Sequence, residues 1–561
     1  MAIQEIYKLL QNQNKELRMN KIHSLHFTYL LLLLSSCNRA SITPEPVPVR
    51  NTQNLLSRGQ IDSCITKIIN VKKDFRWADA SEQVVWSALT HSGNTVSIGY
   101  KPKGWTNERV DAEIHRINIQ SQECKEAKKE ILKLVWEEEK KNKPDLKIDR
   151  LDIYSDNNLP VVCIPTYSLG TIEKLRASEL VRYVEPMGYA PFSDSEKKGN
   201  QLQSSSGGLG CNRANPYGGI LGPNVDYKLL QPNSKMSWNY AYHNIPEAWK
   251  ISTGKGIKVM VIDTGCSLNQ ENLQSSFNQG ESIGRSVEHV VTLRDVIDYS
   301  PSRFYRDRGT PMGRRHAVLD EPKAPGDPCG HGTMMAGVVA APRGTDGNAC
   351  GVAYNCDLVT AKASEDVVIS TDSEILGVIE AFNLAANRED IKIISMSMGL
   401  IFWDGMLADA IKKAANRGKL IFCAAGTTAD SFTLTKYWGV IFPASMPEVL
   451  AVTGIKDNLK EICDVCHEGP EVDFVAVMQQ SNKKFLSLAL ATSGDIPAVD
   501  GGSSVATAMM AGMAAIVWSK YPKKSASEIL DILKKSSTNQ YKNPKWGSGV
   551  LDVNKAVRSQ F

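Results

Sequence analysis

Residues 257–265 read IKVMVIDTG, an apolar run that ends in Asp263. Such a run, bounded by polar turn residues, is typical of a strand buried on both faces of a parallel sheet. Across residues 237–561 similar runs alternate with helical patterns, which predicts an α/β fold built on a parallel sheet. Because an open parallel sheet carries its working residues at the carboxyl ends of its strands, Asp263 is a candidate functional residue.

Two further segments place reactive side chains at the starts of helices. Residues 330–337 read GHGTMMAG and put the imidazole of His331 in the first turn of a helix. Residues 501–508 read GGSSVATA and put a serine at a helix N-terminus, where backbone N–H groups are free to face an anion. Taken singly, each motif has an ordinary structural explanation as a cap, a buried histidine or a loop. Together, in the order Asp, His, Ser, they match one known chain order of the Ser-His-Asp triad.

In this order and in its flanking motifs the chain resembles the subtilisin-like serine proteases over roughly residues 237–556. The supporting segments read IISMSMG (393–399), IFCAAG (421–426), FPASMPEVLAV (442–452), VDFVA (472–476) and GSGVLDV (547–553). The resemblance implies a doubly wound, mostly parallel sheet with helices on both faces. It also implies a serine endopeptidase that acts on protein or peptide substrates through an acyl-enzyme.

The resemblance also assigns roles to residues. Ser504 is the implied nucleophile, His331 the general base and later the general acid, and Asp263 the residue that orients the imidazole and stabilises its charged form. Ser503 is the competing nucleophile, but Ser504 is followed by the Val-Ala-Thr of the family pattern. The implied substrate-binding residues are Ser397, Met398, Gly399, Ala424 and Gly426.

The chain departs from the family pattern at the oxyanion position. Family members carry Asn after Ala-Ala-Gly, whereas this chain carries Thr427, and the family's Pro four residues after the nucleophile is Ala508. Losing one oxyanion donor costs about 2.7–4 kcal/mol, or 10²–10³ in turnover. A threonine hydroxyl can donate from a shorter stem, so Thr427 is the predicted oxyanion residue and a lower rate is expected. A protease-shaped binding protein without turnover is the alternative.

An insertion separates Asp263 from His331. It is rich in arginine: Arg303, Arg306, Arg308, Arg314 and Arg315. It is either a solvated surface loop or a segment that shapes the cleft. The second reading leaves open a processing protease of narrow specificity.

The N-terminus predicts export. Residues 19–40 read MNKIHSLHFTYLLLLLSSCNRA, with a basic residue followed by an apolar run at 27–34 that is too short to span a bilayer. The order Leu-Ser-Ser-Cys at 34–37 resembles a bacterial lipobox, in which Cys37 is lipidated and anchors the protein to membrane lipid. An ordinary signal peptide is the alternative. Both place the protein in the bacterial cell envelope, periplasmic or at the cell surface, with release after processing left open.

Export makes the cysteines readable as disulfide partners. The chain has 12, and 12 − 1 leaves 11 without Cys37, so at least one stays free or pairs outside the set. Since Asp263 and His331 are expected to be neighbours, a disulfide between Cys266 and Cys329 is predicted, with two free buried thiols as the alternative. Two further pairs are close enough in sequence to bond locally: Cys350 with Cys356, and Cys463 with Cys466.

Metal and cofactor motifs are few. Residues 463–467 read CDVCH, the attachment pattern of c-type haem, but the pattern occurs once in a loop between protease-like segments. A local disulfide or a plain loop is the preferred interpretation, and no metal site is predicted, because zinc would need two more ligands. No cofactor is required. The resemblance to subtilisin-like proteases implies a structural calcium ion, for which the segment GTDGN at 344–348 is the candidate site.

Composition bounds the remaining possibilities. The 561 residues are 42% hydrophobic and 22% charged, which excludes a disordered chain, and the net charge is 65 − 61 = +4. The net charge is too small to indicate nucleic-acid binding, and no long basic run in the sequence indicates it either. A monomer is expected.

The chain divides into five predicted parts. These are upstream residues and a signal peptide (1–37), a tether (38–60), an α+β domain (61–190), a linker (191–236) and the catalytic domain (237–561). Within 61–190 the pattern predicts a helix at 120–141, a strand–turn–strand unit at 146–164, a helix at 168–180 and a strand at 181–186. This order resembles the inhibitory propeptide of subtilisin-like proteases, and an unrelated binding domain is the alternative.

Overall fold

The computed structural model describes residues 55–72, 74–189, 191, 210–294, 322–428, 439–481, 487–539 and 542–560. Chain contacts separate Met1–Thr52 from Gln53–Phe561, and every described residue belongs to the second unit. Three features predicted from the sequence lie outside the described residues: the apolar signal segment, Cys37 and the arginine-rich insertion.

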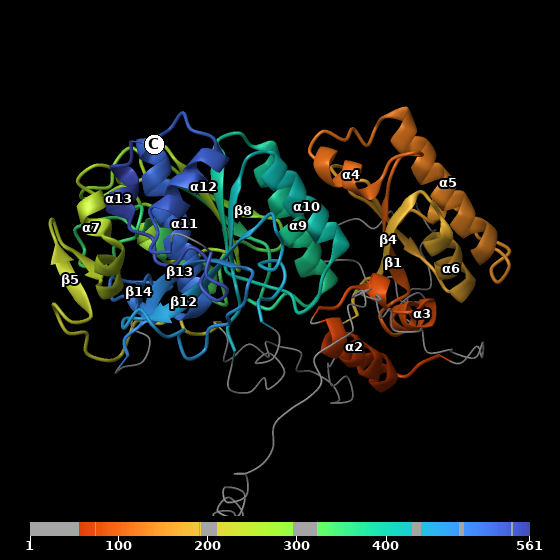
Figure 1. Cartoon of the computed structure of the whole chain (residues 1–561), viewed down its shortest axis with the longest axis horizontal. Coiled ribbons are helices and arrows are strands. Elements are labelled where there is room, and N and C mark those ends of the chain that lie inside the picture. The colour runs from red at the N-terminus through yellow and green to blue at the C-terminus, as the bar shows by residue number, and fades with distance from the viewer. Residues whose placement is uncertain are drawn as a thin grey trace, which may run out of the picture. The chain divides into compact units, whose positions relative to one another are not determined.

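A seven-stranded parallel sheet forms the centre of the C-terminal part (Figure 1). Its order is β13-β12-β11-β10-β7-β9-β8, and every neighbouring pair is parallel. The strands are β7 (Lys258–Asp263), β8 (Val287–Val291), β9 (Asp357–Lys362), β10 (Ile391–Met396), β11 (Leu420–Ala424), β12 (Leu450–Lys456) and β13 (Val472–Gln479). The apolar run at 257–262 is therefore a central strand, which confirms the predicted fold class.

Successive side chains of β7 enter two different cores. Val259 and Val261 join the core that contains α8 (His331–Ala340) and α11 (Gly502–Lys520). Met260 and Ile262 join the core that contains α9 (Asp372–Asn387) and α10 (Gly405–Asn416). Since side chains alternate along a strand, helices cover both faces of the sheet. Three shorter helices, α7 (Ile245–Ala248), α12 (Ala526–Lys535) and α13 (Val553–Val557), complete the first core.

Helix α11 is apolar all round because it lies inside the protein. Among the described helices it alone is long and apolar enough to cross a membrane, yet 89% of its apolar window is buried. A helix that is apolar on every side is typical of the core of a large domain. The burial of α11 therefore accounts for its composition.

The N-terminal part holds a separate antiparallel sheet of order β2-β3-β1-β4. Its strands are β1 (Thr95–Tyr100), β2 (Tyr154–Ser155), β3 (Val161–Pro165) and β4 (Val181–Pro186). Its helices are α2 (Arg58–Lys72), α3 (Glu82–His91), α4 (Asn107–Glu113), α5 (Gln122–Glu139) and α6 (Leu169–Ala177). The predicted helices at 120–141 and 168–180 and the strand at 181–186 are confirmed, whereas α2, α3 and the central strand β1 were not predicted.

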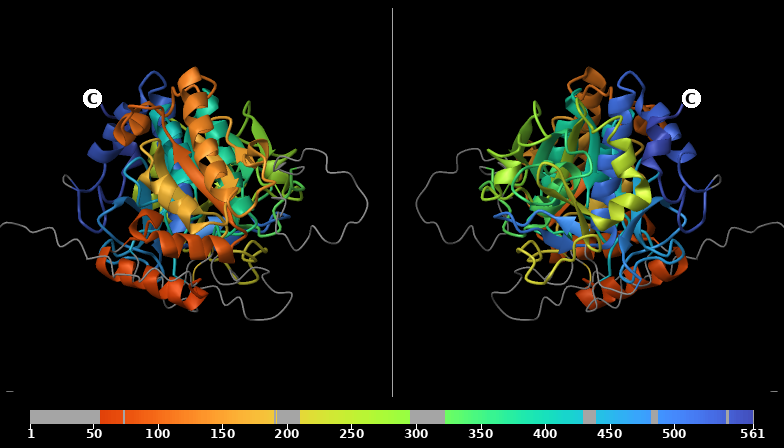
Figure 2. Two further views of the ribbon diagram at one scale, coloured as in Figure 1. Left: turned by 90° about the vertical axis from the view of Figure 1, so that its right-hand side faces the viewer. Right: turned by 90° about the vertical axis from the view of Figure 1, so that its left-hand side faces the viewer.

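The two faces of this small sheet contact different elements. Val162 and Ile164 of β3 pack among α2, α3, α5 and α6, while Val161 and Cys163 join the core that contains α9 and α10. Figures 1 and 2 show the sheet between its own helices α5 and α6 and the pair α9 and α10. The α+β region thus packs against the outer helices of the parallel sheet.

A buried ion pair joins the two parts. Arg182 of β4 donates to both carboxylate oxygens of Asp409 in α10, at 2.6 and 2.9 Å, and to Asp111 at 2.8 Å. The side chains of Arg182 and Asp409 are only 6% and 2% exposed. Glu185, also in β4, accepts a hydrogen bond from the backbone N–H of Gly405 at the start of α10. The last strand of the small sheet therefore makes buried polar contacts with α10.

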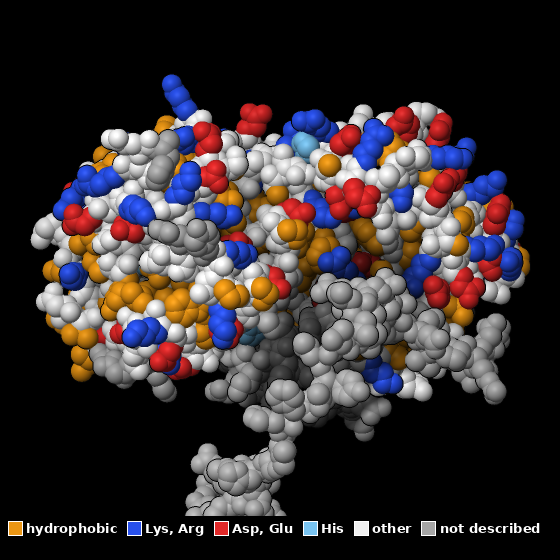
Figure 3. All heavy atoms as spheres, in the orientation of Figure 1, with side chains coloured by type: hydrophobic (Ala, Val, Ile, Leu, Met, Phe, Trp, Pro, Cys, Tyr) orange, Lys and Arg blue, Asp and Glu red, His pale blue; other side chains and the backbone are white. Residues whose placement is uncertain are grey.

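The predicted linker, residues 191–236, contains nearly all of a short hairpin. Strands β5 (Tyr227–Leu230) and β6 (Ser234–Ser237) pair antiparallel within it. Ala214 and Met236, from the same stretch, are buried in the core of α8 and α11. The face drawn in Figure 3 mixes acidic and basic side chains over its described residues.

The Arg182–Asp409 pair yields a stability prediction. Arg182→Ala leaves the Asp409 carboxylate buried without its main cation, and breaking a buried ion pair in this way costs about 3–5 kcal/mol. We expect chemical denaturation to show a free energy of unfolding lowered by that amount. Lys456→Ala, which removes contacts with Glu461 and Asp464 at the surface, is the control and should leave the midpoint unchanged. Equal midpoints for both variants would contradict the assigned role of Arg182.

Candidate active site

The carboxylate of Asp263 lies at the carboxyl end of β7, between the neighbouring strands β9 and β10. The residue is fully buried, and its Oδ1 accepts a hydrogen bond from the backbone N–H of Thr264 at 2.8 Å. Its second oxygen, Oδ2, has no hydrogen-bond partner within the described part of the chain. The Asp263 carboxylate therefore lies at the buried end of the site, held in place by strand β7.

The imidazole of His331 lies directly on that carboxylate. His331 is the first residue of α8, it is fully buried, and its Nδ1 is 2.7 Å from Asp263 Oδ1. Its other ring nitrogen, Nε2, makes no hydrogen bond to any described residue. The ring is therefore held through Nδ1, and Nε2 remains able to take a proton.

Asp327, which the sequence analysis did not identify, joins the strand end to the helix start. Its carboxylate accepts from the Thr264 hydroxyl at 2.8 Å, from the Gly330 N–H at 2.8 Å, and from the N–H and hydroxyl of Thr333 at 2.8 and 2.7 Å. Thr264 in turn accepts from the N–H of Gly332 at 2.9 Å. An acidic residue just before a helix is a recognisable capping signal, so this position was accessible to sequence reasoning.

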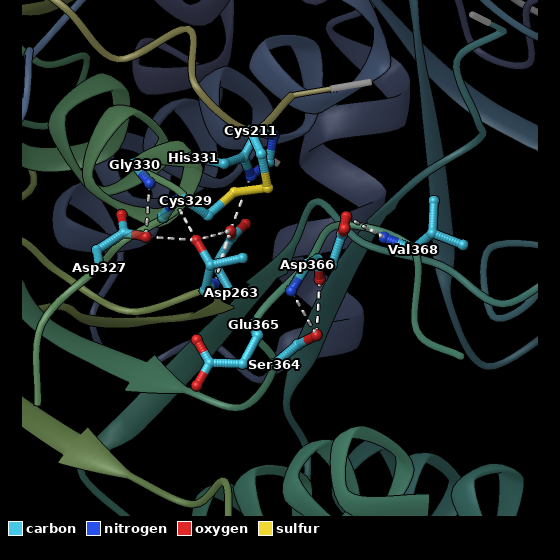
Figure 4. Close-up of a disulfide and its surroundings, with 12 residues drawn as sticks. Cys211, Asp263, Asp327, Cys329, Gly330, His331, Ser364, Glu365, Asp366 and Val368 are labelled. Carbon is cyan, nitrogen blue, oxygen red and sulfur yellow. Dashed lines mark hydrogen bonds and ion pairs between the residues drawn. A yellow bond between two sulfur atoms is a disulfide. The ribbon is translucent and has the colours of Figure 1, made fainter. Parts of the chain in front are cut away.

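A disulfide links this region to the chain before the parallel sheet. Cys211 and Cys329 are bonded with an S–S distance of 2.04 Å, and Figure 4 shows the bond next to His331 and Asp263. The predicted pair of Cys266 with Cys329 is wrong. Cys266 is a free, buried thiol, because the segment around Cys211 crosses the site and takes the Cys329 sulfur instead.

Of the two local disulfides predicted from the sequence, one forms and the other does not. Cys463 and Cys466 form a predicted local disulfide, whereas Cys350 and Cys356 are free and buried.

The histidine of the CDVCH segment is held by protein contacts. Both ring nitrogens of His467 are occupied, one by Gly439 O and the other by the Thr428 hydroxyl, each at 2.8 Å. The CDVCH segment thus has neither free thiols nor a free imidazole with which to hold haem.

Ser504 lies in the first turn of α11, two residues after Gly502, whose φ of 75° is left-handed. Its hydroxyl donates to the carbonyl of Ser397 at 3.5 Å, and the Ser397 hydroxyl donates to the Ser504 carbonyl at 2.9 Å. No hydrogen bond between Ser504 and His331 occurs in the described structure. Contacts of this kind are often long without substrate and tighten on binding.

Thr427 lies beside the residues that begin α11. Its hydroxyl is 2.8 Å from the hydroxyl of Ser503 and accepts from the Ser503 N–H at 3.4 Å. Thr427 also forms a β-bridge with Cys466, so the disulfide loop supports it from behind. A small pocket next to Ser504 is lined by Arg213, Thr427, Val465, Asp500, Gly501 and Gly502.

The predicted substrate-binding residues follow the ends of two neighbouring strands. Residues 397–399 follow β10, where Ser397 contacts Ser504 and Gly399 pairs with Val368. Met398 is only 2% exposed and belongs to the core of α9 and α10.

The other two predicted substrate-binding residues lie at the end of β11. Ala424 ends β11, and a side chain at Gly426 would come within 2.4 Å of His467 Nδ1. All five lie at the same edge of the sheet as Asp263, and their contacts with substrate stay a prediction.

The electrostatics of the site favour a charged imidazole. Burial alone lowers the pKa of His331, but the Asp263 charge and hydrogen bond, with Asp500 and Asp327 adding, hold the pKa above its ordinary value. Burial raises the pKa of Asp500, while His331 and Arg213 act against that rise. The carboxylates thus make His331 a stronger base than a free imidazole.

The candidate calcium loop at 344–348 is held by protein contacts. Asp346 accepts from the N–H of Asn348 and from the side-chain amide of Gln279, both at 2.9 Å. The described residues contain no group of three or more His, Cys, Asp or Glu side chains that could hold a metal ion. Calcium binding stays a prediction.

Known proteins resemble this chain over the region that holds the site. Residues 254–550 match the subtilase family. The chain is 30% identical to the major intracellular serine protease of Bacillus subtilis (strain 168) over 262 residues, which cover 46% of this chain and 70% of that protein. It is also 30% identical to subtilisin DY of Bacillus licheniformis over 229 residues, covering 41% and 78%. A structure of MycP1 with its N-terminal propeptide removed aligns with a TM-score of 0.39 at 22% identity, covering 58% of this chain and 98% of that one.

The geometry predicts how His331 titrates. Because the Asp263 carboxylate stabilises the charged imidazole, NMR titration should give His331 a pKa above the ordinary histidine value. In Asp263→Asn the burial penalty dominates, and the pKa should fall below that value. Asp531→Asn, on the exposed side of α12, serves as the control. An unchanged His331 titration in Asp263→Asn would show that the two side chains are not paired.

Proposed function

This chain belongs to the subtilase family and is a serine protease, and from that premise we propose that it cleaves peptide bonds through an acyl-enzyme on Ser504. The observation that carries the proposal is the buried 2.7 Å contact between His331 Nδ1 and Asp263 Oδ1. A fixed imidazole beside a serine at a helix N-terminus is the arrangement that nucleophilic catalysis requires. The exposure of the two serines supports Ser504, because Ser503 is 1% exposed and engaged with Thr427.

The proposed reaction begins with proton transfer. Ser504 Oγ attacks the substrate carbonyl carbon while its proton passes to Nε2 of His331, and Asp263 stabilises the resulting imidazolium. His331 then gives that proton to the leaving amine as the carbon–nitrogen bond breaks, which leaves the acyl group on Ser504. Water, activated by the same nitrogen, hydrolyses the ester and restores the serine.

The oxyanion of the tetrahedral intermediate needs hydrogen-bond donors. The backbone N–H of Ser504 is one candidate, because it belongs to the first turn of α11. The Thr427 hydroxyl is the second, since it lines the same pocket as Ser504. Its contact with Ser503 must open or be shared for it to donate. This competition favours a slower enzyme, and in its extreme form a binding protein of the same fold.

We also propose that the α+β region acts as a propeptide. Its sheet packs on α9 and α10, and Glu185 accepts from an otherwise free N–H at the start of α10. Processing within 187–236 would then separate it from the catalytic part. A cut between 212 and 236 would leave the two pieces joined through Cys211–Cys329. In that case an N-terminal lipid anchor would still hold the catalytic part.

Export with lipidation at Cys37 completes the proposal. The support is the apolar run at 27–34 followed by Leu-Ser-Ser-Cys. The two disulfides are a second support, because such bonds persist in oxidising compartments outside the cytosol.

A fluorophosphonate probe tests the nucleophile. We expect labelling of the wild-type protein on Ser504, located by mass spectrometry, and none in Ser504→Ala. Ser503→Ala should still label. Thr427→Val, which keeps the shape but loses the hydroxyl, should label up to about 10²-fold more slowly.

Self-processing depends on the same serine. A shorter, self-processed species should appear in wild type and not in Ser504→Ala.

Two outcomes would contradict the assignment. One is an adduct on Ser503 that survives in Ser504→Ala. The other is no labelling of wild type, either as the full chain or after the α+β region has been removed. Labelling that appears only in Thr427→Asn would favour the binding-protein alternative.

Metabolic labelling with a fatty-acid analogue tests the anchor. Expressed in a bacterial host, the wild-type chain should carry the lipid and fractionate with membranes, because a thiol at position 37 accepts it. Cys37→Ser should lose both properties. Cys64→Ser, which removes another free cysteine, should keep them. Equal lipid incorporation in all three proteins would rule out Cys37 as the acceptor.

A further inference from the structure

Two hydroxyl groups meet beside the nucleophile, and the direction of their hydrogen bond decides what Thr427 can do. Thr427 Oγ1 and Ser503 Oγ lie 2.8 Å apart, and at this distance either hydroxyl can donate. If Thr427 donates, its only proton is bound to Ser503 and is withheld from a developing oxyanion. If Ser503 donates, the Thr427 proton stays available to the substrate. The two directions therefore predict opposite roles for Ser503.

Burial favours Ser503 as the donor. The residue is 1% exposed, and the Thr427 hydroxyl is the one hydrogen-bond partner of its side chain among the described residues. Were Thr427 the donor, the Ser503 proton would be buried without an acceptor, which leaves its desolvation uncompensated. Thr427 is only half-buried and lines the pocket beside Ser504, so its own proton has an open side to face. The bond therefore runs from Ser503 to Thr427.

The backbone of Ser503 acts in the same direction. Its N–H also donates to Thr427 Oγ1, at 3.4 Å. A hydroxyl oxygen has two acceptor positions and carries one proton. With both acceptor positions taken by Ser503, the Thr427 O–H points away from Ser503. A hydroxyl that accepts in this way is polarised and becomes a stronger donor.

Gly502 keeps the space beside the Thr427 hydroxyl open. A side-chain carbon at Gly502 would lie 3.1 Å from Thr427 Oγ1, and the φ of 75° at this position favours glycine. The pocket that borders Ser504 is lined by Gly502 and Thr427 but not by Ser503. A Thr427 proton that points away from Ser503 thus faces the pocket next to the nucleophile.

We propose that Ser503 is a positioning residue for the oxyanion of the tetrahedral intermediate. Its hydroxyl and its N–H donate to Thr427 Oγ1, and the Thr427 O–H in turn donates to the oxyanion. The inference rests on the proposed protease function and concerns the same site. The relay stabilises charge only as the transition state forms, which is the condition for raising kcat. The contact between the two hydroxyls is therefore shared during the reaction and does not have to break.

The kinetics of Ser503→Ala distinguish the two directions of the bond. If Ser503 orients Thr427, loss of its hydroxyl lowers kcat for a peptide amide substrate about tenfold and leaves KM unchanged, because the interaction exists only in the transition state. Ser503→Thr, which keeps a hydroxyl, should retain most of the wild-type kcat. Ser519→Ala is the control, because it removes a hydroxyl from the other end of α11, and it should match the wild type.

A double-mutant cycle separates the orientation of Thr427 from a general effect on the fold. In a Thr427→Val background, Ser503→Ala should change kcat no further, because the hydroxyl that Ser503 orients is already gone. A kcat of Ser503→Ala at or above that of the wild type overturns the inference, since it means that Thr427 donates to Ser503. An equal loss in both backgrounds overturns it as well. Both results leave the protease proposal standing while the wild type labels with fluorophosphonate, and failure of the wild type to label overturns both claims.

Discussion

The hydrogen bond between Asp263 and His331 is the constraint on which the rest of the structure depends. It requires the carboxyl end of β7 and the first residue of α8 to meet although the two residues are 68 positions apart in the chain. Asp327 makes this meeting rigid, since it binds both Thr264 after the strand and the N–H groups at the start of the helix. Gly332 permits it, because any side chain there would lie 2.3 Å from Gly265 O.

Two disulfides brace segments that contribute to the site. Cys211–Cys329 ties the segment around Cys211 to the residues just before His331. Cys463–Cys466 closes the loop that pairs with Thr427. Ser504 lies in the first turn of α11, a helix whose residues are almost all buried. The arrangement gives the imidazole of His331 and the hydroxyl of Thr427 fixed positions, which the proposed electrostatic stabilisation of a transition state requires. The disulfide to Cys329 also keeps the segment around Cys211 attached to the catalytic part.

Local patterns in the sequence were enough to find the parallel strands, the fold class and the motifs of Asp263, His331 and Ser504. They were not enough for features that depend on distant packing. Cys211 pairs with Cys329 across 118 residues, so proximity to Asp263 wrongly favoured Cys266. The segment TVSIGY of β1 interrupts its apolar residues with Ser97 and Gly99, so it did not stand out, although it is a central strand of its sheet. Arg213 lay in a Gly- and Pro-rich stretch that reads as a linker until its contacts are seen.

Acylation of Ser504, with His331 shuttling the proton, is the step on which the proposed function depends. Rapid-mixing kinetics with an activated ester substrate tests it most directly, with acid quenching and peptide mapping of the trapped intermediate. We expect a burst of leaving group equal to the enzyme concentration and an acyl group on Ser504. Product release that is linear from the first turnover with no trapped adduct, or an adduct on another residue, would contradict it.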